Sequence, residues 1–164
     1  DLPLLNEAAV LQRGGGIPAA ESWAWHRAAL ATRQAQYDPR LALRIRRGEA
    51  ISDYTELLAE RRAWIARMES ALQGFDALLS PTLPIVAPRT QPLIDSDDAF
   101  FAANALLLRN PSLINLLDGC ALSLPCHRHG DWPVGLMVWS TALADDRVLN
   151  VSLAIEAALA ASRQ

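Results

Sequence analysis

One short stretch of the chain gathers the residue types that bind metals or act as nucleophiles. Residues 126–131 contain a cysteine, two histidines and an aspartate, and Cys120 lies close by in sequence. Such side chains are common zinc ligands, and a cysteine paired with a histidine can act as a nucleophile. Zinc ligands usually come in separated pairs, however, whereas these residues fill one tight turn, where His127 points away from Cys126 if the chain is extended. We therefore predict a solvated turn, with no metal and no cofactor.

The sequence does not contain a complete set of residues for serine-based catalysis. Serine, histidine and aspartate are present, but no serine lies in a G-x-S-x-G elbow. All 15 basic residues are arginine, so the chain contains no lysine. Chemistry that needs a lysine amine, either as a base or as a Schiff-base former, cannot be done by this chain alone. No catalytic residue is predicted here.

The composition narrows the class of protein. A chain of 164 residues is one domain or part of one, and is large enough to bury a core. The net charge of −3 argues against a broad nucleic-acid-binding surface. No apolar run approaches the roughly 18 residues of a membrane span, and no signal-peptide pattern opens the chain. The two cysteines are expected to be ordinary thiols of a cytoplasmic protein.

Residues 1–74 are predicted to be helical. A helix is expected over residues 19–34, where His26 lies on the apolar stripe and is interpreted as a packed core histidine. Asp38 followed by proline indicates the start of a short basic helix at 40–47. Its arginines form either a solvated face or a patch for phosphate or an acidic partner.

The clearest helix of the sequence begins at Ser52 or Asp53 and ends at Gly74. Its apolar stripe recurs with a period of about 3.6 residues and comprises Tyr54, Leu58, Ile65, Met68 and Leu72. We expect this stripe to face the core.

Residues 75–164 are predicted to hold short strands, loops and a final helix. A short buried strand is expected at 76–80, followed by an irregular extended segment that is rich in proline. A helix over 99–108 should then end at the polar break Arg109–Ser112, ahead of a short apolar turn at 113–117.

A hairpin and a last helix complete the predicted elements. The strands are expected at Cys120–Leu124 and Pro133–Trp139, and the polar tip between them is expected at the surface. Both strands alternate only weakly, which is typical of strands covered on two faces. The helix from Asp145 to about Ala161 is apolar nearly all round and should be buried on most sides. So few strands do not make an independent sheet, which indicates part of a larger layered α/β body.

Two segments together resemble the amidase signature family. The family typically reads N-x-x-G-x-P-A-x-S-x-P-x-G and then G-x-P-V-G-L-Q, and the matching residues here are Asn115, Ala121, Ser123, Pro125, Pro133, Val134, Gly135 and Leu136. Upstream, residues 75–82 (FDALLSPT) and Ala87-Pro88 resemble the family's "FD-x-LL-x-P-T … AP" segment. This chain departs from the pattern at Cys120, His127 and Met137, where proline, glycine and glutamine are common.

The resemblance implies that residues 1–164 are a single C-terminal portion of an amidase domain. The implied fold is helix-rich α/β, with a mixed sheet covered by helices that is incomplete in this chain. The implied activity is amide hydrolysis by a Ser, cis-Ser, Lys triad, and this machinery lies outside the chain. The implied partners are the missing N-terminal half, or a second copy, and a small amide substrate, with no nucleic acid and no membrane.

The resemblance also implies pocket-wall residues on the acyl side of the substrate. The polar candidates are Thr82, Arg109, Asn110 and Asn115. Alternatively, the two asparagines cap helix ends and turns, a role that suits asparagine. The substrate stays open among aliphatic amides, aryl amides, urea derivatives and glutamine. Two other classes also stay open, namely a non-catalytic amidase-fold subunit or scaffold and a stand-alone helical interaction module.

Overall fold

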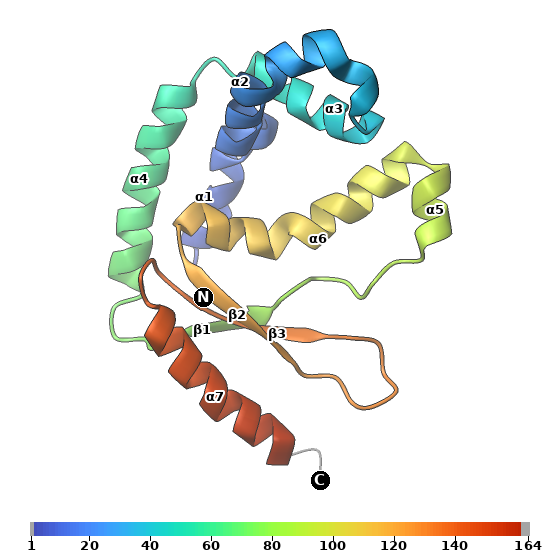
Figure 1. Ribbon diagram of the computed structural model, residues 1–164. Helices are drawn as coiled ribbons and strands as arrows, with labels where there is room; N and C mark the ends of the chain where they lie inside the picture. The colour runs from blue at the N-terminus through green and yellow to red at the C-terminus, as the bar shows by residue number, and fades with distance from the viewer. Residues whose placement is uncertain (1, 162–164) are drawn as a thin grey trace. The chain divides into compact units, whose positions relative to one another are not determined.

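The structure, a computed structural model, describes residues 2–161 of the chain (Figure 1). The chain divides into two units, Asp1–Arg67 and Met68–Gln164. None of the helices within the described range is long and apolar enough to cross a membrane.

The first unit is built from helices. They are α1 (Leu4–Leu11), α2 (Gly16–Arg33), α3 (Pro39–Arg46) and most of α4 (Tyr54–Ala71), with short 3₁₀ turns at Arg13–Gly15, Gln34–Gln36 and Arg47–Ala50. The predicted start of the basic helix is confirmed. The Asp38 side chain accepts hydrogen bonds from the backbone N–H groups of Arg40 and Leu41, at 2.9 and 3.1 Å. A proline at the first helical position completes this signal.

The core of the first unit confirms the packed histidine. His26 lies edge-on to Tyr37, and its Nδ1 is 2.9 Å from the Tyr37 hydroxyl oxygen. Tyr37 in turn packs against a buried cluster of Leu30, Ala42 and Ile45. Two residues of the predicted stripe, Met68 and Leu72, are buried as expected. Nearer the start of α4 the buried residues are Leu57 and Trp64, whereas the predicted Leu58 and Ile65 are only partly buried.

The second unit contains a three-stranded antiparallel sheet with the order β1-β3-β2. The strands are β1 (Leu78–Pro81), β2 (Cys120–Pro125) and β3 (Gly135–Ser140). The predicted hairpin is confirmed, with register from Cys120 opposite Ser140 to Pro125 opposite Gly135. The helix-rich α/β class is confirmed as well.

Burial of the strands follows their place in the sheet. The central strand β3 is buried on both faces from Met137 to Ser140, as predicted, but β2 alternates between covered and exposed residues. The buried strand predicted at 76–80 is wrong in its burial, because β1 is an edge strand and Leu79 is 56% exposed.

The predicted break at Arg109–Ser112 is also wrong. α6 (Asp97–Leu117) runs through it with Pro111 inside the helix. Proline removes one backbone donor, but the helix continues because Ile114, Leu116 and Leu117 are buried beyond it. A short helix, α5 (Thr90–Asp95), also lies in the segment predicted to be extended.

α7 (Asp145–Ala161) covers one face of the sheet, where Val148 packs with Leu124 and Val138. In Figure 1, α6 lies on the other side of the sheet from α7. The expectation that α7 is buried on most sides is wrong within this chain. Leu149 and Leu153 are 49% and 64% exposed, because the described residues offer α7 only one sheet face.

Candidate functional site

The second unit contains a cavity of about 640 Å³ beside the tip of the hairpin. It is lined by the segment that follows β1, by the last residues of β2, by the start of β3 and by Leu107 of α6. The strand register explains how these parts meet. Ser123 and Pro125 point to the face opposite Leu124, so they are on the side away from α7. The cavity therefore lies on the α6 side of the sheet.

Most of the cavity wall is apolar. The residues after β1 and the prolines that flank the hairpin tip contribute most of this hydrocarbon surface. The apolar lining residues are Leu83, Pro84, Ile85, Val86, Ala87, Pro88, Leu107, Pro125, Pro133 and Val134. None of the described residues that line this cavity is an arginine, aspartate or glutamate. Such a wall favours an uncharged group over an ion.

Two hydroxyl groups form the polar part of the cavity. Thr82 Oγ1 and Ser123 Oγ are 2.5 Å apart, and one of them donates to the other. Gly135 makes this arrangement fit, since a Cβ there would lie 2.5 Å from Ser123 Oγ and 2.7 Å from Thr82 Oγ1. Its carbonyl also accepts the Thr82 N–H at 2.8 Å. The absence of a side chain at Gly135 thus lets the hydroxyl of Thr82, directly after β1, approach that of Ser123 in β2.

The hairpin tip supplies His127 to the cavity wall. His127 Nδ1 lies 3.3 Å from both the backbone N and the carbonyl O of Val134, and the tautomer decides which of them is its hydrogen-bond partner. Neither Thr82 nor Ser123 has a described hydrogen bond to this ring. A serine hydroxyl without a base lacks the activation that a nucleophile requires. Among the described groups of this cavity, no base is therefore hydrogen-bonded to either hydroxyl.

The rest of the tip is at the surface, as predicted. His129 and Asp131 are exposed, and His127 is only partly covered. Among residues 2–161, no group of three or more histidine, cysteine or acidic side chains is placed to hold a metal ion. Cys120 and Cys126 are both free thiols.

Of the four predicted pocket residues, the structure places only Thr82 in the cavity lining. Asn110 Nδ2 donates to the Pro81 carbonyl at 2.8 Å, so it ties α6 to the end of β1. Arg109 is exposed, with Nε 3.3 Å from Asn110 Oδ1. Asn115 is exposed near the C-terminus of α6, where its carbonyl accepts the Asp118 N–H.

Sequence reasoning missed Ser123, His127 and Leu107 as lining residues. A signal for Ser123 was present, because it belongs to the motif and its strand was correctly predicted to pair with the strand of Gly135. Leu107 had no such signal, because the predicted break in α6 hid the helix that presents it.

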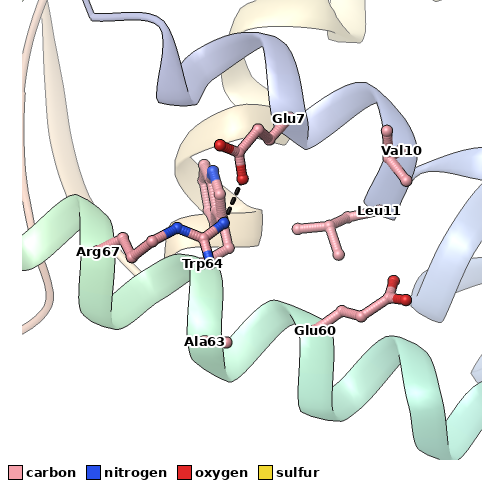
Figure 2. Close-up of a pocket in the computed structure, with 7 residues that line it drawn as sticks. All are labelled: Glu7, Val10, Leu11, Glu60, Ala63, Trp64 and Arg67. Atoms are coloured by element: carbon pink, nitrogen blue, oxygen red, sulfur yellow. Dashed lines mark hydrogen bonds and ion pairs between the residues drawn. The ribbon is translucent and has the colours of Figure 1, made fainter.

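The first unit has a smaller cleft of about 250 Å³ between α1 and α4, shown in Figure 2. Its floor includes Trp64, which is 1% exposed and donates its Nε1–H to the Leu4 carbonyl at 2.8 Å. Glu7 and Arg67 form an ion pair across the cleft.

A second charged group joins α4 to the end of α1. Arg13 pairs with Asp53 at 2.7 Å and with Glu60 at 3.0 Å. The hydrogen bond from Arg13 lowers the pKa of the Asp53 carboxyl, although desolvation opposes this shift. The hydrogen bonds to Asp53 and Glu60 raise the pKa of Arg13. One guanidinium is therefore shared between two carboxylates.

Comparison with known proteins identifies the family. The sequence profile described as Amidase matches residues 4–149. A 2-amino-5-chloromuconic acid deaminase of Comamonas testosteroni is 30% identical over 161 residues, which cover 95% of this chain and 34% of that protein. One subunit of the glutamyl-tRNA(Gln) amidotransferase of Thermobifida fusca is 39% identical over 93 residues, which cover 56% of this chain and 18% of that protein.

Solved structures agree with the sequence relatives. A crystal structure described as an amidase superposes with a TM-score of 0.68 at 27% identity, over 92% of this chain and 35% of that one. The urea amidolyase of K. lactis superposes with a TM-score of 0.75 at 22% identity, which shows the fold alone. The chain spans about a third of the length of the first relative and of the first of these structures. The chain belongs to the amidase family.

Proposed function

We propose that this chain is part of an enzyme that hydrolyses the C–N bond of carboxylic amides, and that it supplies core and one wall of the substrate pocket. The observation that carries the proposal is the cavity of the second unit, which lies between the two segments that match the family's motifs. Thr82 closes the first motif, and Ser123, Pro125 and Gly135 belong to the second. The two segments are far apart in sequence, and a shared pocket gives both of them a role.

The nucleophile and its base are proposed to lie outside residues 1–164. Attack on an amide carbonyl requires a serine that loses its proton to a base, and donors that hold the oxyanion. The family's base is a lysine, and this sequence contains none. The described hydroxyls of the cavity also have no base within hydrogen-bonding distance. Pocket wall and catalytic groups therefore come from different parts of the complete protein.

The test is an activity assay with two forms of the protein. We expect the complete gene product to hydrolyse members of an amide panel and to react with a serine-directed fluorophosphonate. The 164-residue chain alone should show only buffer background. Labelling should map to a serine in a Gly/Ser-rich run that follows a lysine, upstream of residue 1. Stoichiometric labelling of any serine within residues 1–164 would contradict the proposal.

The second candidate is a non-catalytic amidase-fold subunit that docks onto another chain. Leu149 and Leu153 favour it, because they form an exposed apolar strip on one face of α7. The same assay separates the two candidates. A complete gene product that folds and binds a partner, but labels at no serine and hydrolyses no amide, supports the scaffold.

Both candidates require a partner for the exposed apolar surface, either the rest of the amidase fold or a second copy. We expect the isolated 164-residue chain to self-associate in sedimentation, with a melting temperature that depends on concentration. A monodisperse monomer with a sharp, concentration-independent melt would contradict this.

The proposed location is the cytoplasm. Cys120 and Cys126 are free, as expected for thiols in a reducing compartment. Fractionation of cells that express the complete gene product should place it with the cytoplasmic markers. Recovery in a membrane or secreted fraction would count against this.

A further inference from the structure

We propose that the cavity of the second unit selects an uncharged, mostly hydrocarbon group of the substrate, such as an aryl or branched alkyl group, and rejects groups that carry a carboxylate. This inference rests on the proposed amide-hydrolysing function and names the substrate class of that site. It follows from three features of the cavity, namely its wall, its polar pair and its only titratable side chain.

The cavity wall offers no cation that could pair with the charge of a carboxylate. Leu83, Ile85 and Val86 enter from one side, Leu107 from α6, and Val134 from the hairpin. No arginine is among the described lining residues, although arginine is the only strong cation that this sequence has. Moving a carboxylate from water to such a wall leaves its charge unpaired, which is strongly unfavourable. A hydrocarbon group of the same shape gains from the transfer.

The hydroxyl pair suits one uncharged polar atom. One hydroxyl proton is used between Thr82 Oγ1 and Ser123 Oγ, which are 2.5 Å apart. The other proton and the remaining lone pairs are available to a ligand, so the pair can donate once or accept. A single ether, hydroxyl or carbonyl oxygen matches this capacity. A carboxylate needs several donors and finds one.

His127 does not change this conclusion. Its Nδ1 lies 3.3 Å from the backbone N and O of Val134, so the backbone occupies this ring nitrogen in either tautomer. The ring is partly exposed, so it forms a polar edge at the rim of the cavity and leaves the apolar wall unchanged.

The experiment compares two ligands of matched shape in the complete gene product, 4-methylbenzamide and 4-carbamoylbenzoate. They differ by a methyl group against a carboxylate. We expect the methyl compound to bind at least about tenfold more tightly by calorimetry. Equal affinity, or tighter binding of the carboxylate, would overturn the inference. Failure of the proposed function is a separate result, since it requires that no amide is hydrolysed.

Two variants then test whether this cavity is where the methyl compound is preferred over the carboxylate. Val86→Arg introduces a cation at a half-exposed lining position, so it should lower or invert the affinity ratio. Leu43→Arg is the matched control, because Leu43 is 51% exposed against 50% for Val86 and lies on α3, outside the residues that line the cavity. The control should leave the ratio unchanged. A ratio that responds equally to both variants, or to neither, would place the selection elsewhere and refute the assignment.

Discussion

The clefts of the two units use polar groups in opposite ways. The cleft between α1 and α4 is lined by charged Glu7, Glu60 and Arg67, whereas the cavity beside the hairpin has no ionised acid or arginine among its described lining residues. In the first cleft the charges pair across two helices. In the second, two hydroxyls pair with each other and His127 lies at the rim, so most of the wall is apolar.

The difference shows that charge in a cleft is a poor guide to binding. Charges that are paired within the protein are already satisfied, and exposed pairs of this kind add little stability. The buried indole of Trp64 is therefore what holds the first cleft together. The second cavity keeps unused hydrogen-bonding capacity beside a large hydrocarbon surface, which is the composition typical of small-molecule sites.

Trp64→Ala should have the largest effect. Trp64 is 1% exposed and is hydrogen-bonded to the Leu4 carbonyl, so its removal leaves a large void and an unpaired acceptor. We expect a loss of about 3–5 kcal/mol in the free energy of unfolding, measured with urea. Trp25→Ala is the control in the same unit, because Trp25 is 83% exposed and should change stability by less than about 0.5 kcal/mol. Similar losses in both variants would mean that the indole does not hold the first cleft together.

Gly135→Ala should have the next largest effect, and it should act on the second cavity. The added methyl group would lie within 2.7 Å of both hydroxyl oxygens. Overpacking of this kind typically lowers stability by about 1–3 kcal/mol. Separating the two hydroxyls should also weaken binding of 4-methylbenzamide.

Gly130→Ala provides the comparison for that variant. Its Cβ would meet no atom within 4 Å, but φ is +89°, so the change adds backbone strain alone. We expect lower stability with unchanged affinity for 4-methylbenzamide. If both glycine variants bind this ligand equally well, the close approach at Gly135 is not what shapes the cavity.

Local signals in the sequence predicted local structure correctly. The cap at Asp38 depends only on its neighbours, and the hairpin depends on two short runs joined by a tip. The break at Arg109–Ser112 failed because Pro111 is a local signal that distant packing overrides. The helix continues because residues beyond the proline are buried against other elements, and a sequence window does not contain that information.

The same limit of local signals explains why some candidate site residues lie in the cavity lining and others do not. Thr82 lies in the cavity lining because it closes a motif, and the motif places it directly after β1. Asn110 was a pocket candidate by type, but a continuous α6 turns its amide toward the Pro81 carbonyl. Which face of a helix a polar residue occupies depends on the length and phase of that helix, so the position of Asn110 could not be predicted while α6 was expected to end before it.

A double-mutant cycle at Thr82 and Ser123 should have a smaller effect. Thr82→Val and Ser123→Ala each remove one hydroxyl, and the coupling between them should be about 0.5–1.5 kcal/mol in the free energy of unfolding, as for a neutral hydrogen bond. Thr82→Ser keeps the hydroxyl and should retain most of the coupling. Zero coupling would mean that the two hydroxyls are not hydrogen-bonded to each other. The second cavity would then not differ from the first cleft in the way its polar groups are paired.

Acid should produce the smallest effect, and it should act on the first unit. The hydrogen bond from Arg13 lowers the pKa of Asp53 below its usual value. A carboxyl with a lowered pKa in the folded state contributes stability at pH values above its unfolded pKa, and this contribution is lost as pH falls through the folded pKa. The contribution is small because Arg13 and Asp53 are 40% and 41% exposed and are screened by salt.

NMR titration of the Asp53 carboxyl carbon measures this directly. Arg13→Gln should raise the pKa of Asp53 toward its ordinary value, because it removes the hydrogen bond that lowers it. Arg62→Gln is the control, since it removes the same charge from an exposed position on α4 for which no contact with Asp53 is described. It should leave the titration nearly unchanged. If Asp53 titrates normally in the unmodified protein, Arg13 does not stabilise its carboxylate. The charges of the first unit would then not be paired, and the contrast with the uncharged cavity of the second unit would fail.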